Sequence, residues 1–339
     1  MPAGHSYTMR LKWKAAKATG GTIFAGAGPI GGSFSPTRLT LQLFSSSPAF
    51  ESITTQETNH GSNGVTWVPI PHMAPVTFTP PAASTVVLGG NADLWTDTAG
   101  FNQDIGIQLS GGSFGSGQLI AWKESGGLAG TFSPNAAFVQ GTASVAGGVL
   151  YSAQLVWKTN RLAPSNATIF AGAGPLPSTT SFSPTSLVAQ LVPAGPNPFS
   201  AVITTQPSLT NSDGSTWSNL GVQVTVAPAV SVSAIIGANA DLWTAQVGFN
   251  QDLAVFVSDN GGPDQLLVWK ESGGFGGTFS PNAAFAETVF YMLGGHTYVF
   301  KLKWKTNHSA SGTGATIFAG AGPIGALFSP TGLVVDEVN

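Results

Sequence analysis

The sequence predicts an all-β fold, organised as tandem antiparallel β-sandwich repeats. The sequences Trp-Lys-Glu-Ser-Gly-Gly and Thr-Phe-Ser-Pro-Asn-Ala-Ala-Phe begin at Trp122 and Thr131, and occur again from Trp269 and Thr278. Self-similarity of this kind identifies a repeat architecture. Apolar and polar residues alternate with period two in the strand-like segments, and no stretch keeps an apolar period of 3.6 residues. We therefore expect almost no helix.

Composition sets the class of protein. Of the 339 residues, 42% are hydrophobic, which is enough for packed cores, but only 8% are Asp, Glu, Lys or Arg. An average soluble protein has about 25% charged residues. A surface so poor in charge must be built from small polar residues or be covered by partner subunits. Both alternatives favour an extracellular, cell-surface or particle-associated protein.

Several partners are not expected. The net charge is −3 and no basic run exists, so a nucleic-acid partner is not expected. The chain has no cysteine, which excludes disulfides and thiolate metal sites. No window has the length of a transmembrane segment, and the N-terminus lacks a signal-peptide core; membrane insertion is therefore not expected. We also expect no cofactor and no metal.

The first segment, residues 7–44, is called here a closing segment. Its residues 7–14 alternate apolar and charged or polar side chains, which predicts a half-buried strand. Two further strands are expected, over 22–30 and 39–44. The pattern recurs at 151–192 and 298–335. The alternation places Trp13, Trp157 and Trp304 on the apolar face, so we expect all three in the core.

Two other segments separate the closing segments. The opening segment, 50–90, contains a hairpin signal at Asn63-Gly64 before Trp67. The middle segment, 91–148, contains Asn91-Ala-Asp-Leu-Trp95, a strand over 101–109 and the Trp122 stretch. Both recur once, so the order is closing, opening, middle, closing, opening, middle, closing.

This order predicts two complete units and one incomplete one. We place the units at 51–192 and 199–339, separated by the Pro-rich stretch 192–198. Residues 1–50 then remain as an orphan half-repeat of closing strands, either a natural half-repeat or a truncation. Cutting after residues 150 and 297 instead would leave the orphan at the C-terminus.

The complete units resemble a known family. A turn precedes Trp67 and Trp217, a strand rich in Val, Thr and Phe follows, and a late Tyr-x-x-x-Leu-x-Trp strand completes each unit. In strand order and turn spacing this is similar to the tumour necrosis factor-like jelly-roll modules of bacterial and phage surface proteins. The resemblance implies eight-stranded antiparallel sandwiches that often form trimers and serve attachment or scaffolding. The orphan half-repeat departs from the family pattern.

Charged residues are few, so those that recur at matched positions are candidates for a site. One interpretation is a sugar-binding site in each repeat, in which carboxylates and amides bind hydroxyl groups and an aromatic ring stacks on the sugar. The other, which we favour, is a network of buried hydrogen bonds and ion pairs that fixes loops or a subunit interface. The candidate residues are Asp93, Trp95, Asn102, Asp104, Lys123 and Glu124, with their equivalents Asp241, Trp243, Asn250, Asp252, Lys270 and Glu271.

Catalytic and metal sites receive little support. Paired carboxylates suggest glycoside hydrolysis, but nothing sets the separation of Asp93 and Asp104. Calcium could bind Asp93, Asp97 and Asp104, but Ala245 replaces Asp97 in the second copy. No Ser-His-Asp set or histidine metal cluster recurs.

The sequence thus predicts a non-enzymatic structural or adhesive surface protein that assembles with copies of itself, as a trimer or a fibre, through its β-sandwich repeats. The orphan half-repeat supports this, because closing strands without an opening partner expose edges that can pair with another chain. The alternative is a carbohydrate-binding lectin with one glycan site in each repeat, for which Trp95 and Trp243 are the candidate exposed aromatic residues.

Overall fold

A computed structural model describes residues 5–15, 20–28, 32–42, 49–125, 135–174, 181–193, 200–272 and 281–338. Strands dominate it, and a short 3₁₀ turn at Gly112–Phe114 is the single helical element among these residues. The predicted all-β fold is confirmed. The linker and the repeated Thr-Phe-Ser-Pro stretches at 131 and 278 lie wholly or mostly outside the described residues.

The first sandwich consists of two antiparallel sheets. One has the order β1-β11-β5-β10-β2 with β8 also on β5, and the other has the order β3-β9-β6-β7 with β4 also on β9. The strands are β1 (Ala49–Thr54), β2 (Glu57–His60), β3 (Val68–Pro69), β4 (Val76–Phe78), β5 (Ser84–Thr96), β6 (Gln103–Ser110), β7 (Gln118–Ser125), β8 (Asn135–Val145), β9 (Tyr151–Thr159), β10 (Thr168–Ala171) and β11 (Thr185–Pro193).

The second sandwich repeats this topology. Its sheets have the orders β12-β21-β15-β20-β13, with β18 also on β15, and β14-β19-β16-β17. The strands are β12 (Ser200–Ile203), β13 (Ser208–Thr210), β14 (Ser218–Val226), β15 (Val232–Thr244), β16 (Gln251–Asp259), β17 (Gln265–Ser272), β18 (Asn282–Met292), β19 (Tyr298–Thr306), β20 (Thr316–Ala319) and β21 (Thr331–Val338). We keep the predicted units 1–50, 51–192 and 199–339 as proposed domains.

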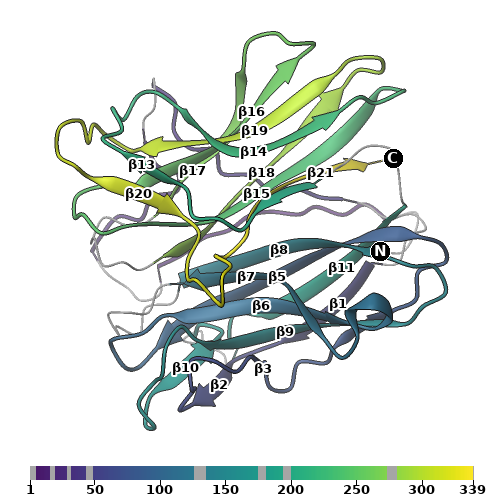
Figure 1. The fold of residues 1–339 in the computed structure, drawn as a ribbon, viewed down its shortest axis with the longest axis vertical. Coiled ribbons are helices and arrows are strands. Elements are labelled where there is room, and N and C mark those ends of the chain that lie inside the picture. Colours follow the sequence, from purple (N-terminus) through teal and green to yellow (C-terminus); the bar gives the residue numbers. More distant parts are fainter. Residues whose placement is uncertain are drawn as a thin grey trace.

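Each core lies between the two sheets of one sandwich. Along β5, buried and half-buried residues alternate, which puts Val86 and Leu88 inside, where they pack with Ile105 and Leu155 of the facing sheet. The predicted alternation of the later closing segments is also observed: Trp157 and Trp304 lie in the two cores. The sandwiches stack on each other, with β7 and β8 of the first against β18 of the second (Figure 1).

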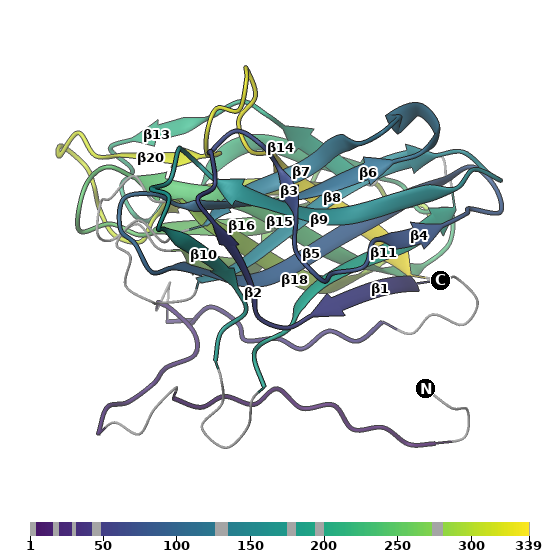
Figure 2. The same ribbon diagram turned by 90° about the horizontal axis from the view of Figure 1, so that it is seen from below.

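The first closing segment behaves differently, and its predicted structure is wrong. Residues 5–15 and 34–42 contain no strand, and Trp13 is 63% exposed where its equivalent Trp304 is 2% exposed. Figure 2 shows residues 5–15 running extended, away from both sandwiches. The physical reason is strand pairing. β9 and β19 already pair with the strands of the two opening and middle segments, so residues 7–13 find no free half-sandwich among the described residues. We call the described residues 5–42 the N-terminal arm.

Candidate functional site

Three matched charged residues form a row across one sheet of each sandwich. In the first sandwich, Asp104 on β6 lies opposite Glu124 on β7 and opposite Lys158 on β9. Cross-strand partners point to the same face of a sheet. Because Ile105 faces the core, this row lies on the outer face, and yet all three side chains are buried.

Hydrogen bonds and an aromatic ring compensate for this burial. The Lys158 ammonium group is paired with the Asp104 carboxylate, and its Nζ lies 5.0 Å from the centre of the Trp67 ring. Asn102 and Asn160 donate hydrogen bonds to Glu124 Oε1 at 2.6 and 3.1 Å. Every ionised or polar head in the row therefore has at least one internal partner.

The second sandwich repeats the row. Lys305 Nζ lies 2.5 Å from Asp252 Oδ2 and 5.0 Å from the centre of the Trp217 ring. Asn250 Nδ2 donates to Glu271 Oε1 at 2.6 Å. A network kept in both copies, with the same partners, fits the interpretation in which these residues hold the fold.

Burial shifts the ionisation of the first row. It raises the pKa of Asp104 to about 6, although the Lys158 charge acts in the opposite direction. Burial, followed by the Asp104 charge, raises the pKa of Glu124 to about 8. Burial therefore favours the protonated form of Glu124, and a buried acid that keeps its proton needs no second cation.

We expect the first sandwich to lose stability as pH rises from about 5 to 7.5. Between the ordinary value of 4.5 and about 8, folded Glu124 keeps a proton that the unfolded chain releases, so the free energy of unfolding falls by about 1.4 kcal/mol per pH unit for each such proton. Urea unfolding at several pH values measures this slope. Glu124→Gln should flatten it, with the half-buried Glu271→Gln as the matched control. A stability that increases over this window would contradict the prediction.

The Trp-Lys stretch of the first sandwich contacts the second sandwich rather than its own row. Lys123 Nζ donates to the backbone oxygen of Pro330, and the Glu124 backbone N–H donates to Asp241 Oδ2 at 3.0 Å. Ser329 Oγ donates to the same carboxylate oxygen at 2.5 Å. Burial raises the pKa of Asp241 to about 6 and lowers that of Lys123 to about 8.

Gly322 completes this contact. A Cβ added to it would lie 3.0 Å from the Trp122 ring, and its φ of +105° also disfavours other residues. The turn around Gly322 therefore fits closely over Trp122. Two recurring sequence features therefore meet between the two sandwiches. One is Trp-Lys-Glu-Ser of the first sandwich, and the other is the Gly-Pro turn with the Phe-Ser-Pro that follows it in the second.

The predicted aromatic residues lie elsewhere. Trp95 and Asp93 are on the outer face of β5, in the sheet opposite to Asp104. The Trp95 indole N–H donates to Gly172 O at 2.9 Å, and its ring stacks on Phe170 with centroids 3.8 Å apart. Trp243 donates to Gly320 O at the same distance and stacks on Phe318.

The predicted sugar-site residues thus fall into three places: the buried rows (Asn102, Asp104, Glu124, Asn250, Asp252, Glu271), the docking contacts (Lys123, Lys270, Asp241) and the outer faces of β5 and β15 (Asp93, Trp95, Trp243). They do not form one site in each repeat, and their role in binding sugars stays a prediction. Asn160, which binds Glu124, was not identified from the sequence. The signal that could have identified it is the sequence Lys-Thr-Asn, which recurs at 158 and 305 and is absent after Lys14.

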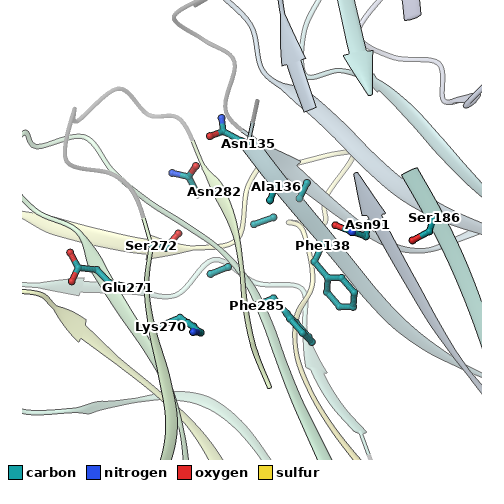
Figure 3. A pocket seen from close by; sticks show the side chains of 13 residues that line it. Asn91, Asn135, Ala136, Phe138, Ser186, Lys270, Glu271, Ser272, Asn282 and Phe285 are labelled. Carbon is teal, nitrogen blue, oxygen red and sulfur yellow. The ribbon is translucent and has the colours of Figure 1, made fainter. Parts of the chain in front are cut away.

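A cavity of about 690 Å³ lies where the two sandwiches meet. Figure 3 shows Lys270, Glu271 and Ser272 of the second sandwich on one side and Asn91 and Ser186 of the first on the other. Between them lie two matched pairs, one residue of each pair from each sandwich: Asn135 with Asn282, and Phe138 with Phe285. The rings of the two phenylalanines are 4.0 Å apart.

No protein-family model and no curated protein matches the chain. Solved structures similar to it include PNGase F, a glycosylasparaginase from Flavobacterium meningosepticum, at 11% identity and a TM-score of 0.36, over 86% of this chain and 96% of that one. The tandem CBM22 domains of Paenibacillus barcinonensis Xyn10C match at 10% identity and a TM-score of 0.23, over 84% and 92%. The infectious bursal disease virus Gt strain matches at 11% and 0.25, over 90% and 80%.

These comparisons correct two expectations. The prediction that the chain is not an enzyme is contradicted, because PNGase F, an enzyme, is among the structures similar to it, and that prediction is withdrawn. At these TM-scores the likeness assigns no activity to this chain. Of the predicted family resemblance, β-sandwich architecture alone is retained. Among the described residues, no helix has the length and apolar character needed to cross a membrane.

Proposed function

We propose that this chain is a structural component of a surface or particle that assembles with copies of itself through its β-sandwich repeats. One observation carries the proposal: the N-terminal arm exposes the apolar residues that its two sister segments bury. Tyr7 is 46% exposed and Leu11 60%, whereas Tyr298 and Leu302 are 2% and 0% exposed.

The arm therefore presents an unusual surface. Its exposed apolar residues are Tyr7, Met9, Leu11, Trp13, Ile23, Phe24, Phe34, Leu39 and Leu41. So many exposed large apolar residues in one segment are typical of a site of interaction with another protein. The low charge of the chain, 8%, weakens the electrostatic repulsion that would otherwise oppose association of copies.

The expected native mass exceeds the 34.5 kDa of one chain. Light scattering after size-exclusion chromatography measures it, and a dimer, a trimer or an open-ended polymer would each support the proposal. The chain without residues 1–48 should have the native mass of a single chain, because the deletion removes the exposed apolar segment and leaves both sandwiches complete.

Two double variants make this test specific. Leu11→Ser with Trp13→Ser should reduce assembly in proportion to the apolar surface lost, whereas Lys12→Ser with Lys14→Ser, on the alternate positions, should not. A full-length chain that is a monomer at all accessible concentrations would contradict the proposal.

Carbohydrate binding is a second hypothesis, favoured by one specific observation. Each sandwich has a half-buried pair of stacked rings on its outer sheet, Trp95 with Phe170 and Trp243 with Phe318. A sugar that stacks on such a ring changes its fluorescence. We expect a glycan ligand to shift tryptophan emission in the chain and to lose that effect in Trp95→Ala with Trp243→Ala. A glycan screen that changes neither emission nor stability would remove this hypothesis.

A further inference from the structure

The chain makes the same docking contact twice. Lys123 of the first sandwich donates to the backbone oxygen of Pro330, in the Phe-Ser-Pro turn of the third closing segment. Lys270 of the second sandwich donates to the backbone oxygen of Pro36, the equivalent residue of the arm. Ala27 of the arm packs against the apolar cluster that contains Trp269, as the turn at Gly322 packs against Trp122.

The turn of the arm also has the internal structure of its sister turns. Ala27 N–H donates to Ser35 Oγ and Ser35 N–H donates to Ala27 O, both at 2.8 Å. Ala321 and Ser329 make the same two bonds at the same lengths. From Thr22 to Gly31 the arm is identical in sequence to Thr316–Gly325. The arm thus docks as a closing segment, although it has no sandwich of its own.

A third pair of contacts repeats in the same order. Gln190 at the end of the first sandwich's last strand donates to Asp336 Oδ2 at 2.8 Å. Asp336, the equivalent residue of the second sandwich, also accepts a hydrogen bond from Gln42, the equivalent residue of the arm. The arm therefore stands beside the second sandwich as the second stands beside the first.

The connection of the chain favours a ring over a row. The arm contacts the second sandwich but is joined by residues 43–48 to Ala49 of the first. A link of that length spans at most about 25 Å. The end of the arm therefore lies within reach of the first sandwich, as a closed ring of three equivalent positions requires.

The cavity lies at the third position of this ring, where the arm supplies a closing segment without opening and middle segments. Between the first and second sandwiches, Asn239 Nδ2 donates to Phe138 O at 3.0 Å, and Gln140 N–H donates to Asn239 Oδ1 at 3.3 Å. Asn91 is the equivalent of Asn239, and Phe285 the equivalent of Phe138. Both line the cavity, so it is bounded by the two faces that a third sandwich would contact.

We propose that this third position binds an opening-and-middle half of the same repeat, which pairs with the arm to complete a third sandwich. The inference rests on the proposed assembly role and names its partner: a polypeptide with the strands equivalent to β12–β18. Its Asn-Ala-Asp strand contacts Glu271 and Phe285, and its Trp-Lys stretch contacts the Phe-Ser-Pro turn at 182–184 of the first sandwich.

The two complete sandwiches show what such a partner covers. β19 pairs with β14 on one side and with β16 on the other, and these strands bury Phe300 and Trp304. The equivalent residues of the arm, Met9 and Trp13, are exposed. A half-repeat that pairs with residues 5–15 on both sides removes the same apolar surface from water.

The test is binding of a separately produced polypeptide, residues 199–297, to the full-length chain during co-expression. We expect a complex with one copy of each, in which amide hydrogen exchange of residues 5–15 slows to the rate of β19. A chain that lacks residues 1–48 but is otherwise full-length should not bind. Lys270→Ala in the full-length chain removes the hydrogen bond to Pro36 that positions the arm. It should weaken binding by about tenfold, the effect of losing one charged hydrogen bond. Lys301→Ala, on β19 and paired with Asp264 rather than with the arm, is the control.

A second design decides the matter if the polypeptide precipitates. Residues 199–297 are placed directly before Tyr7 of the full chain, which gives three complete repeats in one molecule. Protection of residues 7–15 from exchange in a compact monomer would support the inference. Unprotected arm residues, or binding that survives removal of residues 1–48, would overturn it.

This inference and the proposed self-assembly can fail separately. A full-length chain that is monomeric alone but binds residues 199–297 contradicts self-assembly and supports the third position. A chain that oligomerises yet never protects residues 5–15 supports self-assembly and overturns the third position. If full-length copies form the complex alone, the half-repeat comes from a second copy whose own closing segment has been displaced.

Discussion

Lys158→Ala is expected to destabilise the first sandwich by about 3–5 kcal/mol, because it leaves the carboxylate of Asp104 buried without its cation. Both groups of this pair are almost completely buried, with side-chain exposures of 3% and 2%. The remaining charge has no route to solvent, so the folded state must either keep it unpaired or protonate Asp104. Urea unfolding followed by circular dichroism measures the loss. Lys305→Ala should have a similar effect on the second sandwich.

Two controls isolate burial as the cause. Lys301 pairs with Asp264 at 2.6 Å in a partly exposed position, with side-chain exposures of 25% and 22%. Lys301→Ala should therefore cost less than about 1 kcal/mol. Lys14→Ala, at the equivalent position of the exposed arm, should cost nothing measurable. Replacing both members, as Lys158→Met with Asp104→Leu, should recover much of the lost stability. An equal loss for Lys158→Ala and Lys301→Ala would contradict this account.

Trp304→Ala is expected to cost about 3–5 kcal/mol, the usual loss for a large aromatic residue in a packed core. Its ring lies in the core of the second sandwich. Trp13→Ala, in the same place of the same sequence pattern, should change the free energy of unfolding of the isolated chain by less than about 0.5 kcal/mol, because Trp13 lies on the surface. Calorimetry of the two variants gives the comparison.

The contrast has a clear failure condition. If Trp13→Ala were as destabilising as Trp304→Ala in a chain shown to be monomeric, the arm would have to be packed in a core. If it became destabilising only in an assembled form, the arm would be covered by a partner. The Trp157→Ala variant gives the corresponding value for the first sandwich.

How much could be predicted differs between fold and site. The alternation in residues 151–157 and 298–304 predicted β9 and β19 correctly. Each of these strands meets a complete half-sandwich, which buries its apolar face. The same alternation in residues 7–13 predicted a strand that does not form. Local pattern states which face would be buried, but whether it is buried depends on a partner that no local pattern contains.

The polar residues show a similar division. The recurrence of Asp104 and Lys123 in the second copy marked them as candidates, but the partner of each depends on the register of strands far apart in the chain. That register makes Lys158 the partner of Asp104 and leaves Lys123 to contact the other sandwich. Two recurring lysines thus have different roles, one within a sandwich and one between sandwiches, and sequence alone could not separate them.

The position of the arm also affects the order of events during synthesis. The chain is made from its N-terminus, so the arm is complete before the first opening and middle segments emerge. Until residues 151–191 follow, the arm is the closing segment within residues 1–150 that can pair with that half-sandwich. β9, β10 and β11 must then displace it or arrive before it pairs. The same choice returns when residues 200–292 emerge beside an already complete first sandwich, so slow translation near residue 150 would favour the wrong neighbour.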